Sequence, residues 1–478
     1  MDQKKDSLAA GASTRREFIK KATTAAAVVS SYNAFKTPVY GQAQAPSVGV
    51  TGANNRLVVG FIGVGGQGMA HVRSMKEHAT ENNIAQVAVC DVSTHRMEEA
   101  KKYIESEDKE KAKGQPTKDV QMFEDHRKLL DRKDIDAVVV STVDHWHTKC
   151  SVDAMNQGKH VYIEKPMTRY LGEAFEIYDT VKKTGKVLQV GSQGCSDMKW
   201  HKAAEWIKEG KIGPVVMCQG SYMRNDPQGE WNYDIQAWAT PQDMDWKHWL
   251  GPVHKKVEFN ADHYFRWRKY YPYCSGLLGD LFPHKLHPYM LATGNPEFPL
   301  RVAAVGTRKV LTDKKAKDKK KTEYVRDVPE IVQLIAEFPS GMVMHITSST
   351  VNQTGTQELI RGHKGNIYMG GNRVELKPEE KFAEGDEAVD ADQADGFAGE
   401  HIYLHEANWF DAIRTGKTPN ASIDLAAKVQ TVISLAEMSD RLGMMCHFDE
   451  KTRKVHVYDT NNKKKEVKPI SYGTLELS

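Results

Sequence analysis

The chain has 478 residues, of which 40% are hydrophobic and 27% charged, a composition typical of a folded protein of two or three domains. The formal net charge is +3, but residues 1–45 carry seven Lys and Arg against three Asp and Glu, so the remainder has 59 basic and 60 acidic residues. This balance argues against a nucleic-acid partner, and six cysteines without a CxxC pair argue against a disulfide framework.

Residues 1–45 have the features of an export signal. A basic stretch is followed by a weakly apolar run of Ala, Thr and Val, and the string TRREFIK at residues 14–20 resembles a twin-arginine signal. The apolar run is too short to cross a bilayer, and no later segment is apolar enough to act as a membrane anchor. We therefore expect a signal peptide, cleaved near Ala43 or Ala45, that directs the folded protein to the periplasm through the twin-arginine export machinery.

Residues 46–191 alternate short apolar runs with helical stretches. The runs that predict strands are RLVVGFI, AQVAVCD, DIDAVVVSTV, KHVYIEKP and KVLQVGSQ. Strands that alternate with helices form a parallel sheet with helical crossovers. We therefore expect an α/β domain of the Rossmann type here.

Residues 192–478 have a different pattern. The segments PVVMCQGSYMR, IVQLIAEFP, GMVMHITSST, QELIRGH and GNIYMGG alternate apolar and polar residues, as antiparallel strands do. Helical segments between about residues 401 and 443 end at Gly416 and Gly443, which are suited to helix ends. We expect an α+β domain with an open, mainly antiparallel sheet, whose closing helices can pack back on the first domain.

The turn after the first strand, Gly63-Val64-Gly65-Gly66-Gln67-Gly68, has the pattern G-x-G-x-x-G. Between a strand and a helix, Gly63 permits the tight turn, Gly65 lets the backbone approach a pyrophosphate, and Gly68 lets the helix meet the strand. Asp91 ends the second strand, where a carboxylate binds the ribose diol and repels a 2′-phosphate. The alternative is a glycine turn without a nucleotide. We expect NAD rather than NADP, bound by Gly63, Gly65, Gly66, Gln67, Gly68 and Asp91.

The run DHWHTKCSVDAMNQGKHVYIEKP ends with Glu164-Lys165-Pro166, about a hundred residues after the glycine turn. With this motif the chain resembles the glucose–fructose oxidoreductase, inositol dehydrogenase and MocA (Gfo/Idh/MocA) family over nearly all of its mature length. The leader and the string DWKHWLGP are similar to a secreted bacterial branch. The resemblance implies that Lys165 lies beside the nicotinamide and the reacting hydroxyl, that Glu164 lies on the cofactor side, and that Pro166 follows a cis bond. Without the resemblance, Lys165 would be interpreted as an exposed structural lysine.

A second motif lies in GLLGDLFPHKLHPYM. On one helix Asp280 and His284 would share a face, and the resemblance implies that they are the substrate-binding acid and the catalytic histidine. Oxidation of an alcohol needs a base for the hydroxyl proton, a task suited to histidine, and Lys165 would stabilise the developing alkoxide. Without the resemblance, His284 would be interpreted as a hydrogen-bonded core residue. We predict Lys165, Asp280 and His284 as the catalytic and substrate-binding groups.

His287 stands where the family commonly has an aspartate, and Pro283 and Pro288 can kink the expected helix. We expect His287 to contact the substrate or to pack. Asp280, His284 and His287 could together ligate a metal, but the resemblance implies a site without one, so no metal is predicted.

Several further residues follow strand ends or precede Asp280, and we expect them to contact the cofactor, with a packing role as the alternative. They are Thr142, His147, Gln193, Trp267 and Arg268. The aromatic-rich run Tyr222–Tyr273 suits sugar rings and a subunit interface equally well.

Twin-arginine export carries folded proteins, and a compartment outside the cytoplasm holds little free NAD. We therefore expect NAD(H) to stay bound through turnover and a second substrate to restore it. The resemblance implies a periplasmic oxidoreductase acting on a secondary hydroxyl, for example at C3, of a sugar, glycoside or cyclitol. The alternatives are an NAD-dependent glycosidase of the α-N-acetylgalactosaminidase type, which oxidises its substrate transiently, and a non-catalytic sugar-binding protein. The resemblance also implies a homo-oligomer, a dimer or tetramer, built through residues 192–478.

Overall fold

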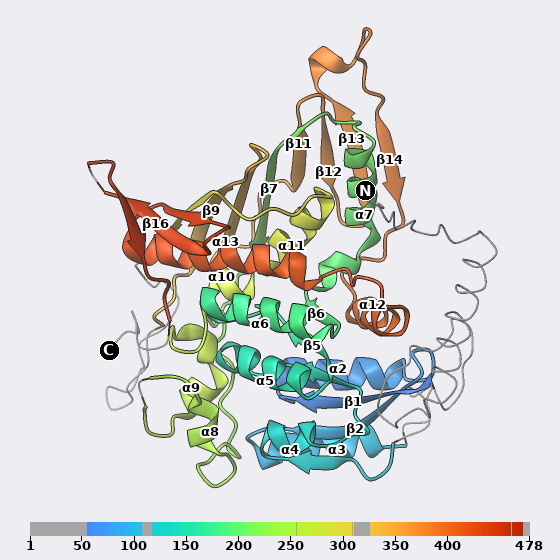
Figure 1. Ribbon diagram of the computed structural model, residues 1–478, viewed down its shortest axis with the longest axis vertical. Coiled ribbons are helices and arrows are strands. Elements are labelled where there is room, and N and C mark those ends of the chain that lie inside the picture. Colours follow the sequence, from blue (N-terminus) through green and yellow to red (C-terminus); the bar gives the residue numbers. More distant parts are fainter. Residues whose placement is uncertain are drawn as a thin grey trace, which may run out of the picture. The chain divides into compact units, whose positions relative to one another are not determined.

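The computed structural model describes residues 55–107, 117–254, 256–307, 309, 326–459 and 461–471 (Figure 1). The predicted signal peptide, residues 1–45, lies outside the described residues. Residues Ala45–Ser478 form one unit by their contacts. Within the described ranges, no helix combines the length and the apolar character needed to cross a membrane.

The N-terminal sheet has six parallel strands in the order β3-β2-β1-β4-β5-β6. The strands are β1 (Leu57–Ile62), β2 (Ile84–Cys90), β3 (Gln121–Phe123), β4 (Ala137–Val140), β5 (His160–Glu164) and β6 (Leu188–Gly191). The helices that join them are α2 (Gly66–Glu77), α3 (Thr94–Glu105), α4 (His126–Leu130), α5 (Asp144–Asn156) and α6 (Leu171–Thr184). The central strands are apolar along nearly their whole length because helices cover both faces. The predicted Rossmann-type domain is confirmed.

Strand order reverses between β1 and β4, which lie side by side. In open α/β sheets, ligands bind outside the carboxyl ends of the strands at such a reversal. The glycine turn after β1 and the loops after β2, β4 and β5 all begin at this edge.

The C-terminal sheet has eleven strands in the order β14-β13-β12-β11-β7-β10-β9-β8-β15-β16-β17. The strands are β7 (Val215–Met223), β8 (Arg301–Gly306), β9 (Ile331–Glu337), β10 (Val343–Ser349), β11 (Leu359–Gly362), β12 (Gly365–Met369), β13 (Arg373–Pro378), β14 (Asp392–Asp395), β15 (Cys446–Asp449), β16 (Lys454–Tyr458) and β17 (Lys464–Val467). All neighbours pair antiparallel except β7 and β10, which are parallel. The predicted α+β domain with a mainly antiparallel sheet is therefore confirmed. Strands β8, β13 and β14 to β17 were not predicted.

Helices cover one face of this sheet. They include α7 (Met198–Lys208), α11 (Pro283–Ala292) and α13 (Ile423–Leu442). Alternate residues of β9 are buried and exposed, because none of the described helices or strands covers the opposite face. On that open face the side chains of Val305 and Ile335 are 72% and 50% exposed.

The closing helices contact the Rossmann domain. α12 (Ile402–Thr415) packs against α2, and α13 lies between α6 and β8 (Figure 1). α13 is buried along most of its length, as a helix between two domains must be.

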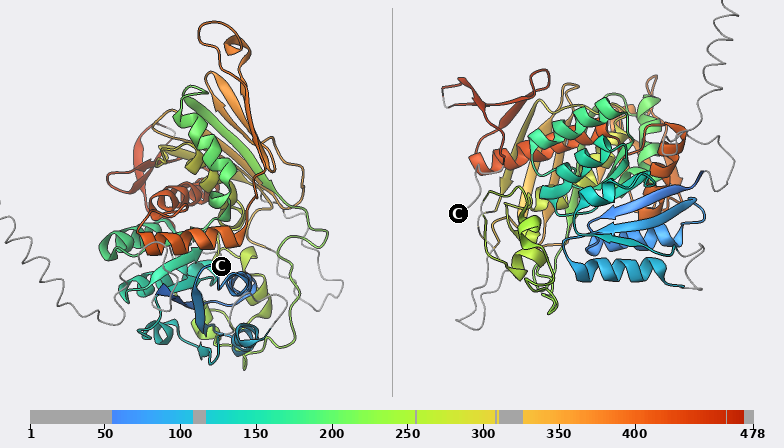
Figure 2. Two further views of the ribbon diagram at one scale, coloured as in Figure 1. Left: turned by 90° about the vertical axis from the view of Figure 1, so that its right-hand side faces the viewer. Right: turned by 60° about the horizontal axis from the view of Figure 1, so that its bottom comes forward.

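Residues 224–276 run from the end of β7 to the Rossmann domain and back to α10 (Leu277–Asp280), and we call them the crossing segment. They contain three short helices, α8 (Trp246–Leu250), α9 (Ala261–Phe265) and η3 (Trp267–Lys269). Figures 1 and 2 show α8 and α9 beside the Rossmann helices. The segment adds a wall of aromatic side chains beside the carboxyl edge of the parallel sheet.

Candidate active site

A cavity of about 1060 Å³ lies at the carboxyl ends of β1, β2, β4 and β5. It exceeds the roughly 300–1000 Å³ of most small-molecule pockets, as an extended ligand requires. Most of the predicted site residues line it, namely Gly63, Gly65, Gly66, Gln67, Asp91, Thr142, His147, Glu164, Lys165, Gln193, Trp267, Arg268, Asp280 and His284. Gly68 and His287 are the two predicted residues that do not.

The glycine turn has the geometry that a close approach requires. A Cβ on Gly68 would lie 2.1 Å from the carbonyl oxygen of Gly63, so only glycine fits there. Gly63 has a positive φ of 85°, which favours glycine. A Cβ on Gly65 or Gly66, in contrast, would meet nothing within 4 Å, and both residues line the cavity. The open space therefore lies where a pyrophosphate approaches the first amides of α2.

Asp91 follows β2 and closes this turn. Its Oδ2 accepts a hydrogen bond from Val64 N at 2.9 Å, and its Oδ1 accepts one from Ser93 N at 3.0 Å. Burial raises the pKa of this carboxyl, while the two backbone donors favour its ionised form. Each oxygen keeps a lone pair for a ribose hydroxyl.

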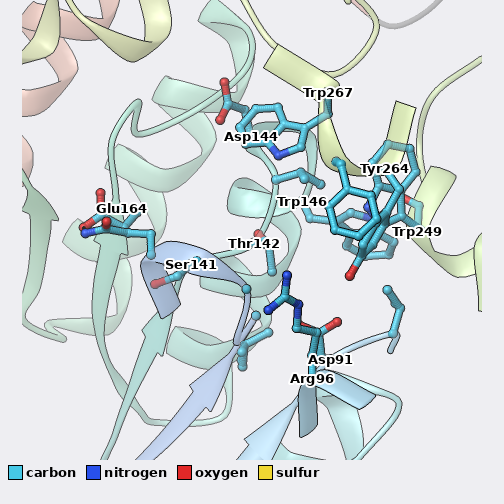
Figure 3. A pocket seen from close by; sticks show the side chains of 18 of the residues that line it. Asp91, Arg96, Ser141, Thr142, Asp144, Trp146, Glu164, Trp249, Tyr264 and Trp267 are labelled. Carbon is cyan, nitrogen blue, oxygen red and sulfur yellow. Dashed lines mark hydrogen bonds between the residues drawn. The ribbon is translucent and has the colours of Figure 1, made fainter. Parts of the chain in front are cut away.

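Two buried hydroxyls on the loop after β4 indicate that the cavity accepts a polar ligand such as a dinucleotide. Ser141 Oγ and Thr142 Oγ1 are buried without a hydrogen-bond partner, and both residues line the cavity (Figure 3). Buried hydroxyls are normally satisfied, so these two point to a polar ligand. With the open Gly65 and the Asp91 carboxylate, they match the phosphates and riboses of NAD.

Lys165 and Asp280 meet at the far end of the cavity. Lys165 Nζ donates to the Asp280 carbonyl oxygen at 2.8 Å and to Oδ1 at 2.6 Å. Asp280 also accepts from Arg268 Nε at 3.2 Å and from Trp231 Nε1 at 3.1 Å. Burial alone would raise the pKa of Asp280, but the charges of Lys165 and Arg268 outweigh it and lower this pKa. The Lys165–Pro166 bond is cis.

His284 lines the same cavity but does not lie on the same helix as Asp280. We expected one helix to carry both Asp280 and His284, but α10 ends at Asp280 and α11 begins at Pro283, because proline fits the first position of a helix rather than its interior. His284 Nδ1 lies 2.8 Å from Oε1 of Glu400, and its ring stacks on Tyr222 at 4.6 Å. Its Nε2 has no hydrogen-bond partner among the described residues.

His287 lies in the interior, apart from the cavity. Its Nδ1 lies 3.2 Å from the carbonyl oxygen of Pro283, and the residue is 1% exposed. Burial lowers the pKa of His287 to about 3, so the ring is neutral at physiological pH. Of the two roles expected for it, packing fits this position. No group of three or more His, Cys, Asp or Glu side chains suited to a metal occurs among the described residues.

Glu164 is the centre of a buried network. Its Oε1 accepts from Gln67 Nε2 at 3.1 Å and from Gln193 Nε2 at 3.0 Å, and lies 2.8 Å from His71 Nε2. His71 Nδ1 lies 2.7 Å from Oε1 of Glu406 on α12. Burial alone would lower the pKa of His71, but its two carboxylate partners raise it to about 9, so the ring is an imidazolium.

Sequence reasoning missed several residues here. His71 and Glu406 were not singled out, because no local pattern pairs positions 335 residues apart. Asp144, the first residue of α5, lines the cavity and is 4% exposed. Burial raises the pKa of Asp144 to about 7. Its place two residues after Thr142 could have drawn attention to it.

Only some of the aromatic residues of the crossing segment line the cavity. Trp238, Trp249 and Trp267 line the cavity, together with Tyr264 and Phe265. Trp231 and Trp246 do not line it. In Figure 3, Trp249, Tyr264 and Trp267 face the Rossmann loops across the cavity.

The family comparison agrees with this geometry. The family model GFO_IDH_MocA, described as "Oxidoreductase family, NAD-binding Rossmann fold", matches residues 57–192. These residues are thus similar to the NAD-binding Rossmann domain of that oxidoreductase family. The match ends just after β6 and includes the glycine turn, Asp91, Glu164 and Lys165.

The relatives that match this chain by sequence include proteins named as glycosidases. The α-N-acetylgalactosaminidase of Shewanella oneidensis is 26% identical over 269 residues, which are 52% of this chain and 56% of the relative. A glycosyl hydrolase family 109 protein of Shewanella baltica is also 26% identical over 269 residues, with the same coverage. The chain thus spans about half the length of the curated relatives it matches.

Solved structures share the fold over most of the chain. An oxidoreductase domain protein from Kribbella flavida has a TM-score of 0.62 at 20% identity, covering 83% of this chain and 100% of its own. Levoglucosan dehydrogenase in complex with NADH and levoglucosan has a TM-score of 0.60 at 19% identity, covering 82% of this chain and 98% of its own. At such identities the likeness establishes the two-domain fold alone.

Proposed function

We propose that the protein is an exported, NAD(H)-dependent oxidoreductase that oxidises a secondary hydroxyl of a sugar, glycoside or cyclitol. The observation that carries the proposal is that Lys165, from the Rossmann domain, contacts Asp280, from the C-terminal domain, and that both line with His284 the cavity that begins at the glycine turn. NAD would be held by the glycine turn, Asp91 and the hydroxyls of Ser141 and Thr142, and when bound it supplies the hydride acceptor.

Lys165 has the position of an electrostatic catalyst. Two of its ammonium hydrogens are used by Asp280, which leaves the third for the oxygen of a substrate hydroxyl. A fixed positive charge beside this oxygen stabilises the alkoxide that develops as the hydroxyl proton leaves. Asp280 is the positioning partner, because it holds Nζ through two acceptors.

His284 has the position of the general base. Its Nδ1 is engaged by Glu400, so Nε2 is the nitrogen that is free to take the hydroxyl proton. The Glu400 carboxylate orients the ring and stabilises the imidazolium that forms. Burial alone would raise the pKa of Glu400, but its hydrogen bond with His284 lowers it, so the carboxylate stays ionised.

A transient-oxidation glycosidase is the second candidate, favoured by the relatives named α-N-acetylgalactosaminidase and glycosyl hydrolase family 109 protein. Such an enzyme restores its own cofactor within each turnover. The two candidates share the hydride step at Lys165 and His284 and differ in whether a glycosidic bond is broken.

The location and assembly belong to the same proposal. The twin-arginine string at residues 14–20 supports export of the folded protein with its cofactor, and a second substrate would then restore the cofactor in place. The open face of the C-terminal sheet, with Val305 and Ile335 exposed, supports a homo-oligomer formed through this face.

Mass spectrometry of products tests the function. The as-isolated protein is incubated with a panel of saccharides, with and without an electron acceptor, beside the Lys165→Met variant. A product lacking two hydrogen atoms supports the oxidoreductase. Free sugar released from an aryl glycoside without net oxidation supports the glycosidase, and bound sugar without any product contradicts both.

A further inference from the structure

The cavity continues past Asp91 to side chains that do not belong to a Rossmann domain. At this end of the sheet the fold places the adenosine ribose of a dinucleotide. The cavity wall here is formed by Trp238, Tyr264 and Phe265 of the crossing segment together with His95 and Arg96 of α3. The adenosine end of the site is therefore built by both domains.

Hydrogen bonds attach the crossing segment to the connection between β2 and α3. Asp243 Oδ2 accepts from Ser93 Oγ at 2.6 Å, and its Oδ1 accepts from His95 N at 3.1 Å. Backbone contacts extend the junction, since Thr94 N donates to Asp243 O at 3.1 Å and a β-bridge joins Ser93 to Met244. The Asp243 carboxylate thus caps the N-terminus of α3 and also attaches the crossing segment to it.

A second junction joins the segment to the first turn of α5, which follows β4. The Trp249 carbonyl oxygen accepts from Trp146 Nε1 at 3.0 Å and lies 2.9 Å from His145 Nε2. Gly251 has a positive φ of 47°, and a Cβ there would lie 2.5 Å from the Trp146 ring. The segment is therefore attached both to the connection between β2 and α3 and to the start of α5.

The side chains that line the cavity near these junctions offer what a nucleoside binds. The His95 ring stacks on Trp238 with centroids 4.4 Å apart, and the Arg96 guanidinium lies over the same indole at 5.1 Å. Arg96 Nε is buried without a hydrogen-bond partner, and Figure 3 shows the guanidinium pointing into the cavity near Tyr264. Aromatic faces and a guanidinium plane bind bases by stacking, and an unused N–H donor beside Asp91 suits a ribose oxygen.

We propose that the crossing segment is a clamp on the adenosine half of the cofactor, formed by Trp238 and Tyr264 with Arg96 and held shut by Asp243. It deepens the proposed function, in which NAD(H) stays bound through turnover, and rests on it. Release of the cofactor then requires both junctions to open, which makes dissociation slow.

Cofactor retention tests the clamp separately from catalysis. The full-length protein and its Trp238→Ala and Asp243→Asn variants are purified, and the NAD(H) that each releases on heating is quantified together with the rate of exchange against labelled NAD. We expect the unaltered protein to keep its cofactor and both variants to exchange it at least about tenfold faster, the scale of one lost base stack. Phe259→Ala is the matched control, because Phe259 belongs to the same segment, packs on Trp246 and does not line the cavity.

The site of the effect is checked by competition. Nicotinamide mononucleotide, which lacks the adenosine half, should displace bound NAD about tenfold better from the Trp238→Ala variant than from the unaltered protein, whereas ADP-ribose, which loses the same stack as NAD, should compete equally well in both. Thermal unfolding confirms that each variant is folded, and Tyr264→Leu replaces one that is not. Unchanged exchange in Trp238→Ala and Asp243→Asn, or free exchange in the unaltered protein, overturns the clamp. Loss of retention in these variants while no saccharide is oxidised supports the clamp and rejects the proposed function.

Discussion

Lys165 Nζ lies 2.6 Å from Oδ1 of Asp280, a residue 115 positions further along the chain. The pair joins the end of β5 to the end of α10, so the ammonium group of one domain is held by the carboxylate of the other. Both side chains are about nine-tenths buried, with 12% and 10% exposed. The relative placement of the two domains therefore controls the geometry of the site.

Replacing Asp280 should lower the rate of hydride transfer while leaving the cofactor bound. In Asp280→Asn the anion that holds Lys165 and Arg268 is lost, so the ammonium is no longer fixed, and kcat should fall roughly 100-fold. Steady-state kinetics and the as-isolated NAD(H) content check this result. Asp424→Asn is the control, because it breaks an exposed ion pair with Lys182 far from the cavity. Equal kcat for Asp280→Asn and the control would contradict the role of Asp280.

The two members of the His284–Glu400 pair should have unequal effects. His284→Asn removes the proton acceptor and should lower kcat by roughly 100-fold or more. Glu400→Gln keeps a hydrogen-bonding partner and removes only charge, so a drop of about tenfold is expected. Pre-steady-state measurement of NADH formation separates this step from product release. If Glu400→Gln is as damaging as His284→Asn, the carboxylate itself takes part in proton transfer.

Two alanine substitutions in the glycine turn should separate folding from cofactor binding. Gly65 has a φ of −68° and open space beside it, so Gly65→Ala should fold normally but bind NAD at least about tenfold more weakly, since the methyl enters the phosphate space. Gly68→Ala places a methyl against the Gly63 carbonyl and should destabilise the protein by at least about 2 kcal/mol. Denaturant unfolding and cofactor titration check the pair. The reverse pattern would show that the turn does not face the phosphates.

Asp144 should make the protein less stable as the pH rises. Burial raises its pKa to about 7 from a usual value of 3.8, so the folded protein holds a proton that the unfolded chain loses. Stability from this group is present below about pH 4 and is lost as the pH rises through about 7. Asp144→Asn removes the titration. The free energy of unfolding of this variant minus that of the parent should therefore be about 2 kcal/mol larger at pH 8 than at pH 5. A pH-independent difference in urea unfolding would mean that Asp144 titrates normally.

His71 should stabilise the protein below neutral pH. Its pKa is raised from 6.5 to about 9, so its stabilising effect is full below pH 6.5 and declines as the pH rises through about 9. His71→Gln leaves Glu164 and Glu406 without their shared cation and should lower the unfolding free energy by about 3 kcal/mol at pH 6. The loss should be smaller at pH 9.5. Thermal unfolding of the parent and the variant at both pH values measures this difference. An equal decrease in the unfolding free energy at pH 6 and pH 9.5 would show that the His71 ring is neutral.

The helix that was expected to carry both Asp280 and His284 shows where local reasoning failed. Spacing by four predicts a shared face only if the helix is continuous, and Pro283 starts a new helix instead. Both residues still line the cavity, because the chain continues in nearly the same direction through Leu281 and Phe282, both with helical backbone angles. The resemblance to a family identified the pair, while its geometry came from the fold.

The sequence by itself determined the Rossmann domain, the glycine turn and the Asp91 position, because these depend on periodicity and on backbone space within about thirty residues. Only the tertiary structure decided which side chains share the cavity with them. Glu406 reaches His71, Glu400 reaches His284 and Asp243 reaches Ser93 across 335, 116 and 150 residues. Such contacts have no local signature, since side chains far apart in the sequence meet only after both sheets and α13 have packed against one another.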